Sequence, residues 1–172
     1  MSTLYVDTIN EKTSGNSVQI PGHVVQVVSS TYSTAGSTTS ASPIQMWSGL
    51  SITPKFANSI IKVECNWFAV HHDYYDGFIQ IYRNGSALSA TKKVIRNAAH
   101  TGNTFVGGGS RNFWYCPAWL WSFTEAAGGT SQITYSLYGW TGNAAHQLEW
   151  NQASANGNET PTSTLTLMEI AQ

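Results

Sequence analysis

The chain has 172 residues, of which only 10% are charged, and its formal net charge is −1 with neutral histidines. Such a length suits one domain with a short extension, and that domain can bury a sizeable core. The eight Lys and Arg residues are scattered. This argues against nucleic acid or an anionic membrane as a partner, because phosphate binding relies on clustered basic side chains.

The aromatic content is high, with seven Trp, eight Tyr and six Phe. Combined with so little charge, it favours a surface that is partly covered by identical subunits, although an aromatic-rich core would explain the same composition. No apolar run in the sequence is long enough to span a bilayer, so we expect no membrane insertion. We interpret Cys65 and Cys116 first as small buried apolar residues, and a disulfide between them stays open.

Residues 1–22 are expected to form an arm separate from the main domain. Leu4 and Val6 alternate with Tyr5 and Ile9 in a short strand, which a polar turn then interrupts. So short a segment cannot build its own core, and it would gain order by adding to the sheet of a partner. The alternative is a strand folded back on its own domain. We therefore assign Leu4, Tyr5, Val6 and Ile9 to partner binding.

Residues 23–172 contain a succession of period-two runs. The apolar run 24–28 predicts a strand covered on both faces, whereas in 59–70 one apolar row, headed by Ile61, predicts a half-buried strand. The run 77–83 ends at Asn84-Gly85, which is a strong signal for a two-residue hairpin turn. Further strands are expected at 111–123, 131–140, 145–151 and 162–170. Only a short helix is expected between 87 and 99, where a structured loop is the alternative.

These runs, with turn clusters between them and no long helical period, predict an all-β fold. We expect an antiparallel jelly-roll-like β-sandwich with a short N-terminal β arm. The last strand contains an inconsistency, because Glu169 shares a face with Leu165 and Leu167. A bulge would move the carboxylate to the other face, or a cation such as Lys62 or Arg83 would pair with it.

The segment 71–76 is the best place for a metal or acid–base site. It contains His71, His72, Asp73 and Asp76, but adjacent residues on a strand point to opposite faces and the spacing is not diagnostic. We favour a solvated hairpin tip between 59–70 and 77–83. No catalytic motif was found, so we expect no catalytic residues, no cofactor and no enzymatic activity.

The segment 112–121 carries large apolar side chains on both faces of an extended strand. Both faces then need cover, which the sandwich core supplies on one side and a neighbouring subunit of a three-fold ring on the other. Alternatively, one face is a platform on which sugar rings stack. The residues concerned are Phe113, Trp114, Tyr115, Trp119 and Trp121.

Segments along nearly the whole chain resemble a known family. The segments 1–10, 17–28, 49–54, 58–63 and 163–170 look like those of small tail-fibre-like virion proteins from tailed bacteriophages, mostly marine and cyanophage-like. The resemblance implies a structural protein of the virion, assembled in the host cytoplasm and located at the tail or on the capsid surface.

From the resemblance and the pattern together we expect a homotrimer in a tail fibre or spike that attaches to the host surface. Its partners would be other virion proteins and a host surface glycan, contacted through loops at 71–76, 100–112 and 141–158. The alternative is a capsid decoration (cement) or head-fibre protein that stabilises the shell.

Overall fold

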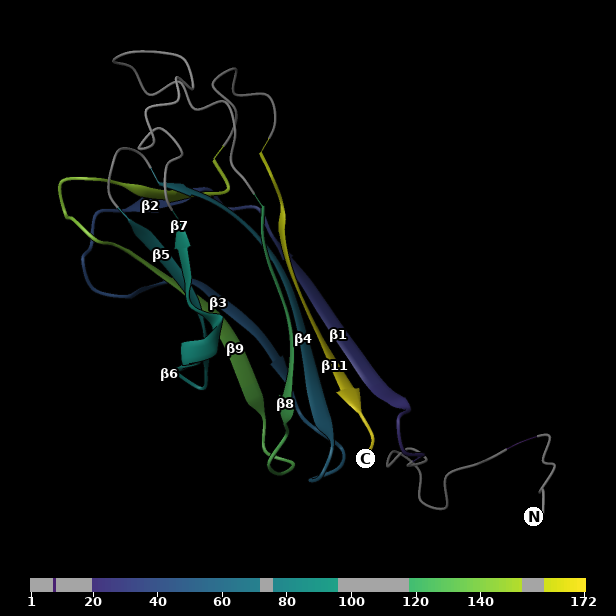
Figure 1. Cartoon of the computed structure of the whole chain (residues 1–172). Helices are drawn as coiled ribbons and strands as arrows, with labels where there is room; N and C mark the ends of the chain where they lie inside the picture. Colours follow the sequence, from purple (N-terminus) through teal and green to yellow (C-terminus); the bar gives the residue numbers. More distant parts are fainter. Residues whose placement is uncertain (1–7, 9–19, 72–75, 96–117, 153–159) are drawn as a thin grey trace.

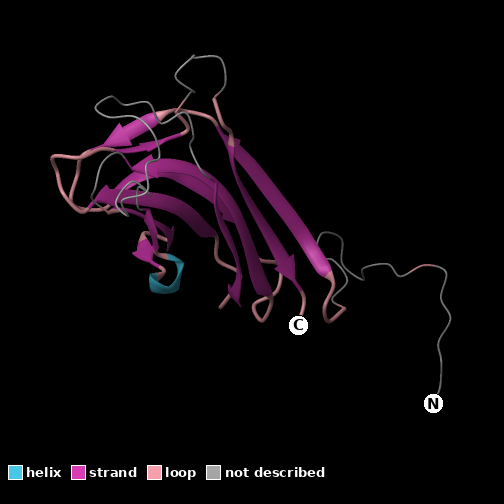
Figure 2. Ribbon diagram, turned by 45° about the horizontal axis from the view of Figure 1, so that its top comes forward, coloured by secondary structure: helices cyan, strands magenta, loops and turns pink. Residues whose placement is uncertain are grey.

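The computed structural model describes residues 8, 20–71, 76–95, 118–152 and 160–172. They form two antiparallel sheets packed face to face (Figures 1 and 2). The first sheet, sheet I, contains β1 (Val24–Tyr32), β2 (Gly36–Thr38), β4 (Ile60–His71), β8 (Ala118–Ala126), β10 (Leu148–Trp150) and β11 (Ser163–Ile170). Sheet II contains β3 (Ile44–Ile52), β5 (Gly77–Arg83), β6 (Ser86–Ala87), β7 (Lys93–Ile95) and β9 (Ile133–Thr141).

The order of the strands is that of a jelly roll. In sheet I, β11 lies between β1 and β4, and β8 pairs with the other side of β4. In sheet II, β9 lies between β3 and β5, whose other side pairs with β6 and β7. The chain thus crosses repeatedly between the sheets, and its first and last long strands are neighbours. The prediction of an antiparallel jelly-roll-like sandwich is confirmed.

The core lies between the sheets and follows the period-two pattern. In β4 the side chains of Ile61, Val63, Cys65, Trp67 and Ala69 are all buried, as the alternation predicts. Tyr32, Trp47 and Trp67 form a stack with ring centroids 5.3–6.0 Å apart, which joins β1 and β4 of sheet I to β3 of sheet II. Cys65 is a free thiol, and burial raises its pKa to about 12.

Two turn and bulge positions require positive φ angles. Asn84 and Gly85 have φ angles of 48° and 78° and connect β5 to β6, which confirms the predicted hairpin turn. Gly49 has a φ of 86° and lies where the register between β3 and β9 shifts. The helix allowed between residues 87 and 99 is only a 3₁₀ turn, η1 (Ser89–Thr91), followed by β7.

Two expectations about the strands were wrong, and one strand was missed. The run 24–28 is not covered on both faces within one chain: Val24 and Val27 are about half exposed, because β1 is the edge of sheet I. The segments 59–70 and 77–83 do not form a hairpin, since β4 belongs to sheet I and β5 to sheet II. Strand β3 was not predicted at all, because its two bulges interrupt the alternation.

Glu169 is fully buried, and neither expected remedy operates. Strand β11 keeps a regular alternation through Glu169, while Lys62 pairs with Glu64 and Arg83 pairs with Glu125. The carboxylate instead accepts hydrogen bonds from the backbone N–H groups of Lys55 and Phe56 and from the side chains of Gln26 and Ser59, at 2.6–3.0 Å. Burial alone would raise the pKa of Glu169, but these hydrogen bonds outweigh it and leave the pKa below its usual value.

Candidate interaction surfaces

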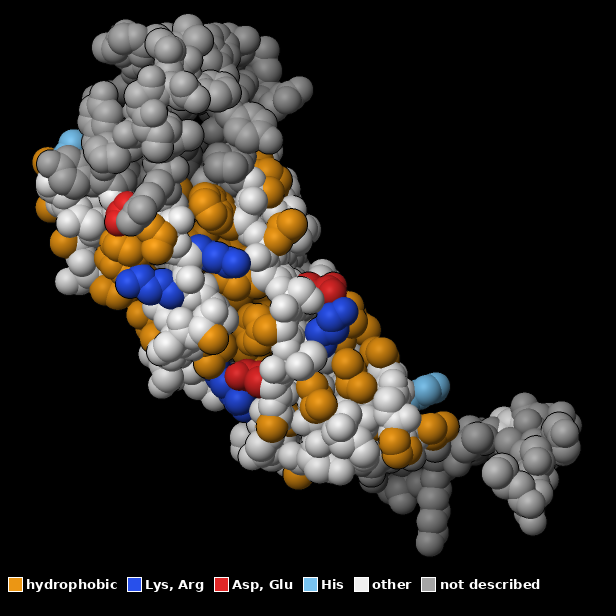
Figure 3. All heavy atoms as spheres, in the orientation of Figure 1, with side chains coloured by type: hydrophobic (Ala, Val, Ile, Leu, Met, Phe, Trp, Pro, Cys, Tyr) orange, Lys and Arg blue, Asp and Glu red, His pale blue; other side chains and the backbone are white. Residues whose placement is uncertain are grey.

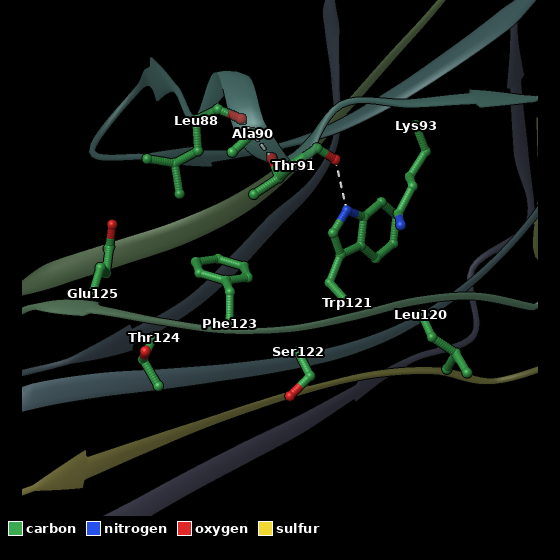
Figure 4. A pocket seen from close by; sticks show the side chains of 10 residues that line it. All are labelled: Leu88, Ala90, Thr91, Lys93, Leu120, Trp121, Ser122, Phe123, Thr124 and Glu125. Carbon is green, nitrogen blue, oxygen red and sulfur yellow. Dashed lines mark hydrogen bonds between the residues drawn. The ribbon is translucent and has the colours of Figure 1, made fainter.

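A groove lies at the open edge of the sandwich between β8 of sheet I and the β6–η1–β7 segment of sheet II, and its volume is about 490 Å³ (Figure 4). Trp121 and Phe123 project into it from β8, and Lys93 and Glu125 carry its charges. We call it the β8 groove. Its lining residues are Leu88, Ala90, Thr91, Lys93, Leu120, Trp121, Ser122, Phe123, Thr124 and Glu125.

Hydrogen bonds fix the side chains of the β8 groove. The indole N–H of Trp121 donates to the carbonyl of Thr91 at 2.6 Å, which connects the two sheets across the groove (Figure 4). The ammonium group of Lys93 lies 5.9 Å from the centre of the Trp121 ring. At the other end, the hydroxyl of Tyr135 donates to Glu125, and Arg83 lies 3.3 Å from the same carboxylate. Burial, followed by this hydrogen bond, raises the pKa of Tyr135.

A second surface is the outer face of sheet II, where aromatic side chains of β5 and β9 are paired. Phe78 stacks on Trp140 with centroids 5.2 Å apart, and Tyr82 stacks on Tyr138 at 3.9 Å. The ammonium group of Lys92 lies 4.4 Å from the centre of the Phe78 ring and 5.2 Å from that of Trp140. We call these four aromatic residues the aromatic strip; all four are half-buried.

A third surface is the outer face of sheet I near the start of β1. Val24 and Val27 are 50% and 53% exposed. Their partners in the register are Ile170 and Met168, and Ile170 in turn is opposite Ile60 on β4. We call these five side chains the valine patch. Apolar side chains extend over the face shown in Figure 3 with few charged groups between them. The Lys62–Glu64 pair, with 2.7 Å between its charged atoms, is on the same outer row of β4 as Ile60.

Two of the five residues predicted for a subunit interface or glycan platform are described by the structure. Trp119 and Trp121 belong to the inner row of β8, and their indole N–H groups donate to the carbonyls of Ala69 and Thr91. Neither ring therefore lies flat on an open face. Phe113, Trp114 and Tyr115 lie outside the described residues, as do Cys116 and the arm residues Leu4, Tyr5, Val6 and Ile9.

The metal candidates are only partly covered by the structure. His71 is the last residue of β4, but its side chain lies outside what the structure describes, as do His72 and Asp73. The backbone carbonyl of Asp76 accepts a hydrogen bond from the N–H of Gly142 at 2.6 Å. Among the described residues, no three His, Cys, Asp or Glu side chains form a group that could hold a metal ion. That same part of the chain contains no helix long and apolar enough to cross a bilayer.

Sequence reasoning missed the aromatic strip, although the signal was present. Phe78 and Tyr82 alternate with the buried Ile79 and Ile81, so they had to lie on the outer face of the strand that was predicted. Tyr138 and Trp140 alternate in the same way in β9, but the pairing of β5 with β9 could not be deduced from either segment alone.

Comparisons with known proteins give no family assignment. No protein-family model matches the chain, and no curated protein is significantly similar to it.

Proposed function

We propose that this chain is a non-enzymatic structural protein of a bacteriophage virion, a component of a tail fibre or spike that attaches the particle to the host surface. The resemblance of its terminal and central segments to small virion proteins motivates the assignment to a phage. The attachment role rests on the aromatic strip, a surface whose chemistry suits the apolar faces of sugar rings.

The aromatic strip supports a glycan as the ligand for two reasons. Its paired rings stand on a rigid sheet, because Phe78 and Tyr82 are on β5 and their stacking partners are on the hydrogen-bonded neighbour β9. Lys92 places hydrogen-bond donors beside the rings, within reach of hydroxyl or carboxylate groups of a sugar. A rigid site loses little conformational entropy on binding.

Three-fold assembly is the second part of the proposal. The valine patch would pack against neighbouring subunits, because an apolar area of this kind is typical of interface cores and is costly to leave in water. The aromatic strip is on the other sheet, so subunit packing through the valine patch would leave it accessible.

The attachment role is tested with purified protein on a glycan array and in a host-cell adsorption assay. The variant Trp140→Leu keeps the position apolar but removes the large ring that stacks on Phe78, and we expect at least a tenfold loss of binding. The control Ser48→Ala changes an exposed residue of β3 that lies outside the aromatic strip, and should bind normally. No binding by the unaltered protein would reject attachment.

The position in the particle is tested separately by cryo-electron microscopy of the virion. A few copies at the tail would support a fibre or spike. Hundreds of copies on the shell would instead favour the capsid decoration role, and would reject the tail assignment.

A further inference from the structure

Strand edges of a sheet expose unpaired backbone groups, and proteins normally protect them with bulges, short strands, charges or proline. Three of the four edges in the described part of this sandwich are protected. Strand β1 begins with a bulge and β3 contains two, while β6 and β7 have only two and three residues. Strand β2, which pairs with β10, has only three residues.

The remaining edge, β8, has neither a bulge nor a proline, and among the described residues a charged side chain contacts its backbone only at the end, where Arg83 donates to the carbonyls of Ala126 and Ala127. It pairs with β4 at nine consecutive positions without a register shift, and its other side borders the β8 groove. It contains no Lys, Arg or Pro, and its only charged residue, Glu125, turns inward toward Tyr135 and Arg83. Leu120 is also 66% exposed on its outer row. A long, regular edge whose one carboxylate points inward is a site for pairing with another strand.

We propose that β8 pairs antiparallel with β8 of a second copy of this chain, across a two-fold axis at Ser122. Ser122 is the middle residue of the nine-residue strand. Two-fold contacts require a surface that is complementary to itself, and antiparallel pairing of identical strands satisfies this automatically. The two sheets I would then form one continuous sheet.

The side chains of β8 suit this register. On the outer row Ala118 would face Ala126, Leu120 would face Thr124 and Ser122 would face its own copy, so no like charges are opposed. On the inner row, Trp121 would face Phe123, and aromatic cross-strand pairs are favourable.

The charges in the groove support the same arrangement. Lys93 lies beside Trp121, whereas Glu125 lies at the other end of the groove (Figure 4). A two-fold axis between them reverses the direction of the second groove, so the Lys93 end of each copy approaches the Glu125 end of the other. A parallel arrangement would place like charges together.

The contact is tested first by cysteine cross-linking in a Cys116→Ser background, in which Cys65 is buried and poorly reactive. Directly opposed residues in an antiparallel pair have Cα atoms about 4.5–5.5 Å apart, within the range of a disulfide. Ser122→Cys should therefore give a covalent dimer under mild oxidation. Thr124 is also exposed on the same row, but the two copies of Thr124→Cys would be about 13 Å apart and should not cross-link. Cross-linking by neither, or by both equally, would overturn the proposal.

The second test is the molar mass in solution by light scattering. Ser122→Lys would place two ammonium groups opposite each other on the axis, and we expect it to halve the mass of the assembly. The control Ser48→Lys adds the same charge to an exposed serine of the bulged edge β3 and should leave the mass unchanged. An unchanged mass for Ser122→Lys would reject β8 pairing. Because neither result depends on glycan binding or on three-fold packing, failure here is separate from failure of the proposed function.

Discussion

Glu169 is a buried carboxylate that is stabilised by hydrogen bonds. Lys62 and Arg83, the two cations that the sequence indicated, pair with other carboxylates. The hydrogen bonds of Glu169 connect β11 to the segment that joins β3 and β4 and, through Gln26, to β1. In Glu169→Gln, an NH₂ group would replace one carboxylate oxygen. It would face N–H and O–H donors and could not accept their hydrogen bonds. We expect a loss of about 1–3 kcal/mol in the free energy of unfolding, measured by urea denaturation. The matched control is Glu64→Gln, whose partner Lys62 is on the surface, and it should lose about 0–1 kcal/mol.

The lowered pKa of Glu169 also predicts how stability depends on pH. The unfolded chain has a glutamate pKa of about 4.3, above that of the folded protein. The stabilisation is therefore complete above about pH 4.3 and is lost as the pH falls through the folded pKa. We expect the wild-type protein to lose more stability than Glu169→Gln between pH 6 and pH 3. Equal losses in the two proteins would contradict this role for Glu169.

Gly49 is a position where only glycine fits. A Cβ atom on Gly49 would overlap the carbonyl oxygen of Tyr135, and its φ of 86° is unfavourable for other residues. Gly49→Ala should destabilise the protein by about 3–5 kcal/mol, as measured by thermal and urea unfolding. Gly85→Ala is the control, because its φ of 78° is similar but a Cβ there meets no atom within 4 Å. Gly85→Ala should cost about 1–2 kcal/mol. A similar loss of stability in Gly49→Ala would show that the overlap at Gly49 is relieved.

At the scale of elements, Tyr135 and Glu125 join the two sheets at one end of the β8 groove. Tyr135 is on β9 of sheet II and Glu125 is on β8 of sheet I. Tyr135→Phe removes the donated hydrogen bond and should cost about 1.5–3 kcal/mol. A double-mutant cycle with Glu125→Gln should give a coupling energy of at least about 0.5 kcal/mol. A coupling near zero would show that the two changes act independently.

The strands that the sequence predicted well are those whose alternation is unbroken. Strand β4 is an example, because its inner row from Ile61 to Ala69 continues without a bulge. Strand β3 escaped prediction because Met46 and Trp47 are both buried, so the alternation fails at its bulge. The partners of Glu169 were beyond prediction for another reason: the backbone of Lys55 is 114 positions away, and only the folded topology brings it near.

The candidate surfaces depend on topology in the same way. The alternation of side chains along a strand shows that Phe78 and Tyr82 share a face, but it does not show that β9 supplies their stacking partners. Likewise, the apolar residues of β8 were recognised, whereas their location on an edge follows only from the pairing of β8 with β4. Sequence patterns therefore show which side chains share a face of one strand, but not the surfaces that neighbouring strands form together.

At the scale of the whole molecule, the two proposed contacts involve separate parts of sheet I and can be broken independently. The valine patch lies mainly over β1 and β11, whereas β8 is the opposite edge. With three-fold packing through the patch and two-fold pairing through β8, closed dihedral symmetry gives six copies of the 18.7 kDa chain.

Val27→Asp would introduce a charge into the valine patch, where Val27 is exposed and faces Met168, and should break only the three-fold contact. We expect light scattering to show one third of the wild-type mass for Val27→Asp, half for Ser122→Lys and a single chain for the double variant. Circular dichroism of each variant checks that the sandwich is intact. If Val27→Asp leaves the mass unchanged while Ser122→Lys halves it, the three-fold contact lies elsewhere or does not exist, and the two-fold contact stands alone.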